Sequence, residues 1–502
     1  MRRRRWRREE SFEVSRWLFL RALGVIHLGA FLSLRPQVLG LVGERGILPV
    51  QEYLQRVRGL FPGWKQRLQV APTLFWIDAS DETLTWACRA GIMASCLLSL
   101  GLLPLPALMV LWALYLSFVV VGREFLRFQW DALLLETTAL STLIAPPTLR
   151  LRLGAHRPAA RGALWLLRFL AFRLMFSSGA VKLRSGDRSW RRLTALEHHY
   201  ETQPLPPWTA WFAHQAPRSL HKTATATTFI QELVAPLGML GPRPFRRAAG
   251  VSTVGLQALI SATGNYGFFN ALTAALTLPL LDDACFPRAL AARAKPRKPR
   301  RHSLLAGGAR VAANAFFLLS GVVPLALTVS ERASTRRSMG RVLDLLAPLH
   351  LANPYGLFAV MTTRRPEVIL EGSGDGETWR PYELKWKPGD VHQRPRFVTP
   401  LHMPRLDWLM WFAALDPIRG YRWVTNLMTR LLEGSPPVLR LFGHNPFPGR
   451  PPRLMRASLY DYRFTNRYQR RHEGAWWERE ELGPYLPYVL TRRDAGRDRP
   501  LV

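Results

Sequence analysis

Lys182 is the residue of this chain whose type and position point most directly to chemistry. It ends an apolar run, Ala163–Val181, and follows four small residues, 177–180. Small residues let helices approach one another closely inside a membrane. Desolvation in such surroundings favours the neutral amine, which a lysine needs in order to act as a base. One hypothesis is therefore a membrane enzyme in which Lys182, together with His199, acts on a lipophilic substrate.

The segment His198-His199-Tyr200-Glu201 carries three potential metal ligands within four residues. A zinc site needs three or four protein ligands at defined spacings, and no further partner stands at such a spacing here. We therefore expect a structural or surface role for this segment. The sequence predicts neither a bound metal nor a cofactor.

Signatures of common enzyme classes are missing from the sequence. It contains no Gly-x-Ser-x-Gly, no His-Glu-x-x-His, no Walker loop and no Cys-x-x-Cys. The glycine-rich stretch 372–376 resembles a phosphate-binding loop. It precedes a strand-like segment rather than a helix, however, so it predicts the turn of a β-hairpin.

Apolar segments long enough to enter a membrane must position these residues. A spanning helix needs about 20 mainly apolar residues, and fewer where it is tilted or re-entrant. Several candidates are short, so we predict a polytopic α-helical membrane bundle of about 7–9 spans. The nine candidate segments are Trp17–Leu34, Trp86–Leu103, Ala107–Gly122, Ala132–Ala145, Ala163–Val181, Thr227–Leu240, Gly250–Thr263, Gly267–Leu281 and Val311–Val329.

Several of these apolar segments contain ionisable residues, among them Glu136 and Arg173. An ionisable residue at membrane depth is costly, so it usually faces the bundle interior or a cavity. One interpretation is internal pairing, for example of Glu136 with Arg173. The other is a polar cavity that binds a ligand.

Basic segments predict the orientation of the chain in the membrane. Leu281–Ser303 contains seven Lys/Arg and, after Asp283, no acid, and the N-terminus, 1–16, is rich in arginine. Loops with such a bias face the cytoplasm. With nine spans, the N-terminus is then cytoplasmic and the C-terminal domain is extracytoplasmic. Leu183–Ala226 is the exception, because this arrangement places it outside although it carries Arg184, Arg188, Arg191 and Arg192.

The net charge of +34 accompanies the apolar segments. Residues from Leu351 onward hold 24 Lys/Arg and 16 Asp/Glu, whereas the first 350 residues hold 45 and 19. Anionic lipid headgroups attract positive charge in such places. No nucleic-acid-binding motif accompanies the charge, so the expected partner is the lipid bilayer and not a nucleic acid.

The last third of the chain has the pattern of an α+β domain. Glu367–Gly372 and Tyr382–Lys387 flank the glycine-rich turn and predict a β-hairpin, and Leu454–Phe464 alternates like a further strand. Leu406–Leu415 and Val424–Leu432 are typical of helices. We predict a basic tail (1–16), a membrane domain (17–330), a linker (331–345) and a β-rich C-terminal domain (346–502).

Longer stretches of the sequence resemble the lipase maturation factor family over most of the chain. They include several runs of more than ten residues, which makes a chance match improbable. The matching segments are FQWD (128–131) with Glu136, FRLMFSSGAVKLRSGDRSW (172–190), HYETQPLPPW (199–208), NPYGLFAVMTTRRPEVILEGSGDG (353–376), RLDWLMWFAAL (405–415) and HNPFP (444–448).

The resemblance implies an integral membrane protein that assists the folding and maturation of a secreted client protein, and a lipase is the client that it implies. The membrane would be the endoplasmic reticulum in a eukaryote, or the plasma (inner) membrane in a bacterium. The C-terminal region would be needed for activity. Six tryptophans there are candidate client contacts: Trp379, Trp386, Trp408, Trp411, Trp476 and Trp477. An alternative is that most of these tryptophans are core residues.

A second, local resemblance covers about a dozen residues. Gly179-Ala180-Val181-Lys182-Leu183, followed by Trp190, is similar to a segment of vitamin K-dependent γ-carboxylases. That resemblance implies the catalytic base at Lys182, and it predicts a polar cavity within reach of His198 or His199. The maturation hypothesis needs no such cavity. A transporter is a third class, and the absence of an inverted repeat disfavours it.

Overall fold

The computed structural model describes residues 10–156, 158–294, 304–330, 340 and 343–491. Three predicted regions lie largely outside these residues: the basic N-terminus (1–16), the Lys/Arg-rich end of the basic segment (295–303) and the linker (331–345). The main cluster of buried apolar side chains runs from Phe12 to Leu490. The helical part and the C-terminal part therefore share one hydrophobic core.

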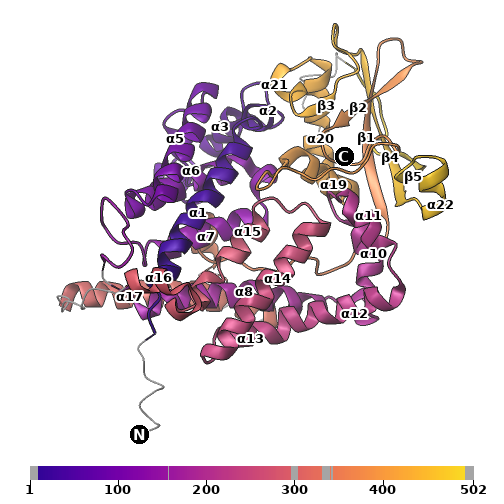
Figure 1. The fold of residues 1–502 in the computed structure, drawn as a ribbon. Coiled ribbons are helices and arrows are strands. Elements are labelled where there is room, and N and C mark those ends of the chain that lie inside the picture. The colour runs from indigo at the N-terminus through magenta and orange to yellow at the C-terminus, as the bar shows by residue number, and fades with distance from the viewer. Residues whose placement is uncertain (1–9, 157, 295–303, 331–339, 341–342, 492–502) are drawn as a thin grey trace.

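In the described part of the chain, five helices are long and apolar enough to cross a membrane. They are α1 (Glu13–Leu34), α5 (Asp81–Leu100), α6 (Pro104–Gly122) with its 3-10 extension η3 (Arg123–Leu126), α8 (Arg161–Arg184) and α17 (Leu304–Val329). Figure 1 shows α1, α5 and α6 side by side in one corner of the molecule, while α17 lies along α8.

The first helix begins on a cap from a distant part of the chain. Asp283 accepts hydrogen bonds from the backbone N–H groups of Glu13 and Val14, at 3.2 and 2.9 Å. The first turn of a helix has unpaired N–H groups and a positive dipole end, and a carboxylate stabilises both. The helix then packs against α5, where a Cβ on Gly91 would stand 2.4 Å from the ring of Phe31. Only glycine allows this approach.

The other helices of this part fall into two groups along the chain, and among them only α14 is as long as the candidate spans. The first group comprises α2 (Val38–Val42), α3 (Val50–Leu60), α4 (Trp64–Val70), η2 (Leu74–Trp76) and α7 (Gln129–Ser141). The second comprises α9 (Arg188–Arg191), α10 (Ala195–Thr202), α11 (Trp208–His214), α12 (Arg218–Phe229), η4 (Ile230–Val234), α13 (Ala235–Met239), α14 (Arg243–Thr263), α15 (Phe269–Ala275), η5 (Leu278–Leu280), η6 (Asp283–Cys285) and α16 (Arg288–Arg293).

The predicted count of seven to nine spans is not confirmed. Ala132–Ala145 falls mainly in α7, which has only 13 residues and is buried by protein. Thr227–Leu240 is interrupted by η4, Gly250–Thr263 belongs to the amphipathic α14, and Gly267–Leu281 contains the short α15. The reason is that an apolar run of 14 residues looks the same in sequence whether protein or lipid covers it.

The C-terminal part is built on an antiparallel sheet with the strand order β3-β2-β1-β4-β5, and β6 pairs with β4. β1 is at the centre and is buried along most of its length. Leu370 of β1 stands opposite Tyr382 of β2 on one side and Ala457 of β4 on the other. The strands are β1 (Arg365–Ser373), β2 (Trp379–Leu384), β3 (Phe442–His444), β4 (Leu454–Phe464), β5 (Trp477–Pro484) and β6 (Leu490–Thr491).

The hairpin turn predicted at 372–376 is confirmed. Asp375 Oδ1 accepts from the backbone N–H groups of Glu377 and Thr378, at 3.0 and 2.9 Å. Gly376 has φ +93°, a conformation that favours glycine. The stretch therefore closes β1 onto β2 and does not cradle a phosphate.

Helices cover the sheet where the sequence predicts them. α19 (Arg405–Leu415) packs against β1, and α20 (Pro417–Leu432) follows it directly. The predicted strand Leu454–Phe464 coincides with β4. The remaining elements are η7 (Ala347–Leu349), α21 (Pro436–Leu439) and α22 (Arg467–His472). In Figure 1 this part occupies the upper right, with α10 and α11 below it.

Candidate functional site

A cavity of ≈ 500 Å³ lies beside Lys182. Its walls come from the end of α8 and from α10, α12, η4, α14, α15 and the segment 357–361. Both Lys182 and His199 line it, so the structure brings together the two residues that the sequence proposed for chemistry. Most of the other lining residues are apolar or threonine: Leu174, Met175, Leu196, Leu220, Thr223, Thr227, Leu256, Leu259, Ile260, Phe269, Thr273, Leu357 and Phe358.

Glu232 is the partner of Lys182, and a π-helical turn positions it. The backbone N–H of Ala235 bonds to the carbonyl of Ile230, one residue further back than in an α-helix. Pro236 explains the shift: it has no N–H, and in an α-helix its ring would clash with the carbonyl of residue 232. Single π turns inside α-helices are frequent at functional sites.

The Lys182 ammonium is surrounded by hydrogen-bond acceptors. Its Nζ donates to both carboxylate oxygens of Glu232, at 2.9 and 2.8 Å, and to the backbone carbonyls of Ser178 and Leu357, at 3.2 and 2.9 Å. A base must present a lone pair to its substrate, and here acceptors occupy the space around Nζ. The catalytic role proposed for Lys182 therefore gains no support from its surroundings.

Gly179 allows this ion pair to form. A Cβ at that position would stand 2.8 Å from Cδ2 of Leu233 and 3.0 Å from Cβ of Glu232. The π turn can therefore lie directly on α8 only because residue 179 has no side chain. This agrees with the expectation that the small residues 177–180 permit close helix packing.

His199 faces the same cavity as a neutral ring. Its ring meets that of Phe358 edge-on, with the centroids 5.0 Å apart, and its Nε2 lies 3.4 Å from the hydroxyl of Tyr266. Burial, reinforced by the positive charge of Lys182, lowers the pKa of His199 to about 4. The ring is uncharged at neutral pH.

The segment 198–201 does not converge on a metal. His199 faces the cavity, whereas Glu201 accepts a hydrogen bond from the backbone N–H of Phe464 at 3.1 Å and lies 3.6 Å from His214. In the part of the chain that the structure describes, no group of three or more His, Cys, Asp or Glu residues is arranged to hold a metal ion.

A second polar cluster joins α7 to the C-terminal part. Glu136 accepts from Arg173 at 2.5 Å, from Asn353 at 3.0 Å and from the hydroxyl of Tyr355 at 2.7 Å. The predicted pairing of Glu136 with Arg173 is confirmed. Gln129, at the start of α7, exchanges two hydrogen bonds with the backbone of Gly356.

Asp131 of α7 makes the strongest link in this region. Arg405 donates to its two carboxylate oxygens at 2.6 and 2.7 Å, and Tyr115 donates to Oδ1 at 2.6 Å. All three side chains are buried. Paired charge-assisted bonds of this kind fix orientation as well as distance. We call Asp131, Glu136 and their partners the α7 interface.

The tryptophans proposed as client contacts fall into two groups. Trp408, Trp411, Trp476 and Trp477 are buried, with 2–6% of their surface exposed. Trp379 and Trp386 are half-buried. The backbone N–H of Trp386 is fixed by Asp407, which accepts from it at 2.8 Å. Burial assigns the first group to the core. The client role stays a prediction, and of the six tryptophans only Trp379 and Trp386 could contact a client without a rearrangement of the fold.

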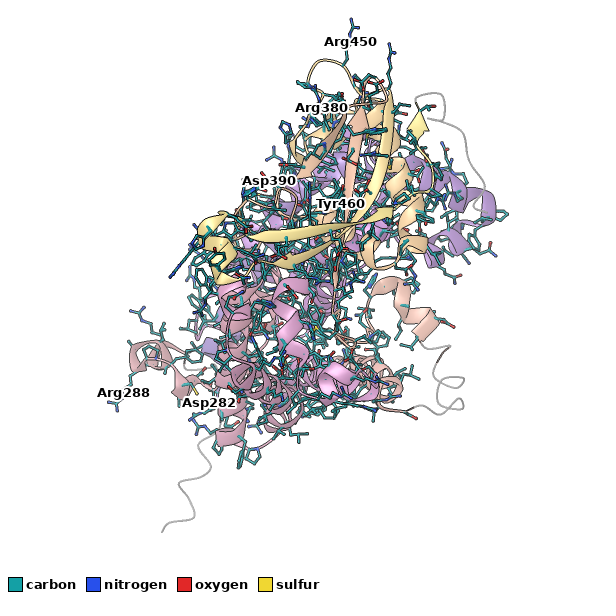
Figure 2. The ribbon with its side chains drawn as sticks, turned by 90° about the vertical axis from the view of Figure 1, so that its right-hand side faces the viewer. Asp282, Arg288, Arg380, Asp390, Arg450 and Tyr460 are labelled. Atoms are coloured by element: carbon teal, nitrogen blue, oxygen red, sulfur yellow. The ribbon has the colours of Figure 1, made fainter. Side chains whose placement is uncertain are left out.

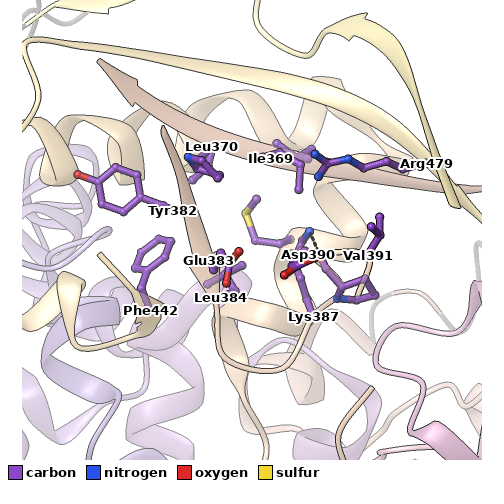
Figure 3. Close-up of a pocket in the computed structure, with 15 residues that line it drawn as sticks. Ile369, Leu370, Tyr382, Glu383, Leu384, Lys387, Asp390, Val391, Phe442 and Arg479 are labelled. Carbon is purple, nitrogen blue, oxygen red and sulfur yellow. Dashed lines mark hydrogen bonds between the residues drawn. The ribbon is translucent and has the colours of Figure 1, made fainter. Parts of the chain in front are cut away.

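A smaller cavity of ≈ 190 Å³ lies between β1, β2 and residues 387–391. Figure 3 shows Tyr382 and Phe442 at one end of it, with Val391 and Arg479 at the other. Lys387 lies 2.7 Å from the buried carboxylate of Glu367, so this cation beside the cavity is already paired.

Sequence reasoning missed Glu232 and Asn270 at the larger cavity, whereas Gln257 is one of the polar residues that the sequence places inside the apolar segments. One signal was available for Glu232: it is the single acid in the apolar run Thr227–Leu240, four residues before Pro236. Asn270 gave no comparable signal, because isolated Asn residues occur in many helices.

Long apolar helices, an amphiphilic cavity and a β-rich part packed on the same core define a polytopic membrane protein with an attached sheet domain. Residues 14–288 match the family model of the lipase maturation factor transmembrane domain, and residues 351–487 match that of the lipase maturation factor C-terminal domain. The chain belongs to the lipase maturation factor family.

Curated relatives cover nearly the whole chain. It is 36% identical to lipase maturation factor 1 of Bos taurus, over 97% of this chain and 91% of that protein. It is 37% identical to lipase maturation factor 2 of Homo sapiens, over 94% and 82%. No solved structure matches the chain significantly. The resemblance to γ-carboxylases receives no support from these comparisons.

Proposed function

We propose that this protein is a membrane-embedded factor that assists the maturation of a secreted lipase. The observation that carries the proposal is the collinear similarity to lipase maturation factors 1 and 2 through both the membrane part and the C-terminal part. A mode of action without catalysis is consistent with the hydrogen bonds that occupy the ammonium group of Lys182. The lipid bilayer and the lipase client are the proposed partners.

The proposed topology places the C-terminal part on the extracytoplasmic side, where a secreted client folds. Asp282 and Arg288, in the basic segment, lie at the opposite end of the molecule from Arg380 and Arg450 (Figure 2). The cap from Asp283 places the start of α1 at the same end as the basic segment. The membrane is the endoplasmic reticulum in a eukaryote, or the plasma membrane in a bacterium.

The proposed division is a membrane domain (17–330) and a C-terminal domain (346–502), and the client binds to the latter. Because the two parts share one core, a deletion of the C-terminal domain would take Arg405 from Asp131, and Asn353 and Tyr355 from Glu136. Point substitutions at half-buried tryptophans are therefore the better test of client binding.

The test uses cells that lack lipase maturation factors 1 and 2 and that secrete a lipase. Expression of this protein should raise the secreted lipase activity per amount of lipase antigen. Trp379→Ala and Trp386→Ala should reduce that ratio, while Tyr468→Ala, at an exposed site on α22, should leave it unchanged. No rise over empty vector, with the protein abundant in the membrane fraction, would overturn the proposed function.

A further inference from the structure

Two buried amide side chains on the wall of the larger cavity have oxygens with no hydrogen-bond partner. They are Oε1 of Gln257 and Oδ1 of Asn270, and the two residues are 5% and 6% exposed. The amide nitrogen of Asn270 already donates to Ser261 at 2.7 Å, so its oxygen is the free group. Buried acceptors are nearly always satisfied in folded proteins. The pair therefore indicates a ligand that brings hydrogen-bond donors.

The remaining walls suit a hydrocarbon chain. Leu174, Met175, Leu256, Ile260 and Phe269 enclose a volume of ≈ 500 Å³, which lies within the range of small-molecule sites, about 300–1,000 Å³. A cavity with apolar walls and a few placed polar groups is the usual form of a site for an amphiphile.

The cavity presents no unpaired charge among the residues that line it. Lys182 and Glu232 neutralise each other at 2.8 Å, and the ring of His199 is neutral. An anionic or cationic headgroup would therefore be desolvated without a counter-charge. A neutral headgroup with donors fits the site better.

The opening faces the side of the helical part. Among the lining residues, the exposed ones include Leu220 and Thr223 of α12 and Leu259 of α14, so the cavity opens between these two helices. In Figure 1 α12 and α14 diverge from α13, with α12 leading to the right and α14 upwards. The surface around them is apolar: Ile230, Val234, Leu237, Phe245, Val251 and Val254 are exposed. Large exposed apolar patches mark contact with membranes or partners.

We propose that this cavity binds one molecule of a neutral, hydroxyl-bearing lipid that enters from the bilayer between α12 and α14. Its apolar chain lies against α8, α14 and α15, and its hydroxyl groups donate to Gln257 and Asn270. The site is independent of client binding, so it goes beyond the proposed maturation function.

The probe is a photoreactive diazirine analogue of 1-monooleoylglycerol, added to the purified full-length protein in detergent. Unlabelled 1-monooleoylglycerol should compete at least about tenfold better than methyl oleate, which has the same chain and no donor. Oleate, which is anionic, should compete as poorly as the ester. Equal competition by all three, or a preference for oleate, would overturn the proposal.

Variants locate the site. Gln257→Leu and Asn270→Leu should each weaken the competition by 1-monooleoylglycerol about tenfold and leave the competition by methyl oleate unchanged. Ala224→Trp, which fills the cavity, should abolish photolabelling. Ala258→Trp is the matched control, because Ala258 lines a neighbouring cavity of ≈ 390 Å³ that shares Gln257, Tyr266 and Asn270.

Labelling that is lost in Ala258→Trp and kept in Ala224→Trp would assign the lipid to the neighbouring cavity and contradict the proposal. Each variant is first checked for a single size-exclusion peak. If a variant fails this check, the discrimination among the three lipids in the unaltered protein still decides the headgroup chemistry. Peptide mapping of the photolabel then decides the position, with α12 and α14 expected.

Discussion

The α7 interface and the cavity beside Lys182 use the same kinds of polar groups and leave them in different states. At the α7 interface every carboxylate oxygen of Asp131 and Glu136 has a partner, and neither residue lines any of the three cavities described above. At the cavity one ion pair is complete, while the oxygens of Gln257 and Asn270 have no partner beside ≈ 500 Å³ of space.

The difference teaches how to separate structural from ligand-binding polar groups in one core. Satisfied buried acceptors fix the positions of the elements that carry them, whereas unsatisfied acceptors are unfavourable unless something else completes them. At the α7 interface Nε and Nη1 of Arg173 are donors without a hydrogen-bond partner, and its guanidinium carbon lies 5.8 and 5.5 Å from the ring centres of Phe169 and Tyr355. The α7 interface therefore holds the membrane part to the C-terminal part. The cavity, by contrast, has the incomplete hydrogen bonding of a site that receives a ligand.

Asp131→Ala should have the largest effect on stability. It leaves the guanidinium of Arg405 buried without its carboxylate, and breaking a buried pair in this way costs about 3–5 kcal/mol. The measurement is the thermal or denaturant unfolding of the purified protein in detergent. Arg419→Ala is the matched control: the exposed Arg419 side chain pairs with Asp416, and such surface pairs contribute about 0–1 kcal/mol. Equal losses in both variants would mean that the α7 interface does not hold the two parts together.

Lys182→Met should have a smaller effect, about 1–3 kcal/mol, because Glu232 keeps some contact with solvent after its partner is removed. Glu232→Gln alone should cost a similar amount. The double variant should recover most of the loss, since neither residue is then left as an unpaired charge. If the double variant loses as much stability as the two single variants together, the ion pair between Lys182 and Glu232 is not the source of the loss.

The double variant also tests the mode of action. A mode of action without Lys182 chemistry predicts that Lys182→Met/Glu232→Gln still raises the specific activity of the secreted lipase, in proportion to its abundance in the membrane. Loss of this effect at normal abundance would reopen a direct role for the lysine.

His199→Phe should have the smallest effect, and it should appear in the pH dependence of the free energy of unfolding. The pKa of His199 is lowered to about 4 in the fold, against about 6.5 in the unfolded chain, so the unfolded state takes up the proton first. Stability from this residue is therefore complete above pH 6.5 and is lost as the pH falls towards 4. Between pH 7 and 5.5 the variant should lose about 1 kcal/mol less than the parent. Parallel unfolding curves for the two proteins at both pH values would contradict the burial of a neutral ring.

Much of the C-terminal part could be predicted from the sequence because its signals are local. The hairpin around 372–376, the strand Leu454–Phe464 and the helix at 406–415 each depend on residues within a few positions of one another. The pairing of Glu136 with Arg173 was also predictable, since two opposite charges in apolar segments have few other ways to be satisfied.

The candidate site was only partly predictable because its contacts are distant in sequence. Lys182 and Glu232 are 50 residues apart, and their meeting depends on the π turn at Pro236 and on the bare backbone of Gly179. The span count failed for a related reason. Whether protein or lipid covers an apolar helix is a property of the assembled core, which no single segment encodes.

The segments that carry the family resemblance contact one another in the fold. FQWD and Glu136 meet NPYG at the α7 interface, and Arg365 donates to backbone carbonyls of Glu201 and Pro204 at 2.6 and 2.9 Å. Several of the recognisable stretches thus lie at the contact between the membrane part and the C-terminal part.

The bond between Asp131 and Arg405 has a consequence for biosynthesis. The two residues are 274 positions apart, and ribosomes add about 5–20 residues each second. The acid is therefore made on the order of tens of seconds before the guanidinium exists. A newly made chain must keep that side chain solvated until its own C-terminal part has been translated and has docked. A helper of other proteins' folding thus has a vulnerable interval in its own.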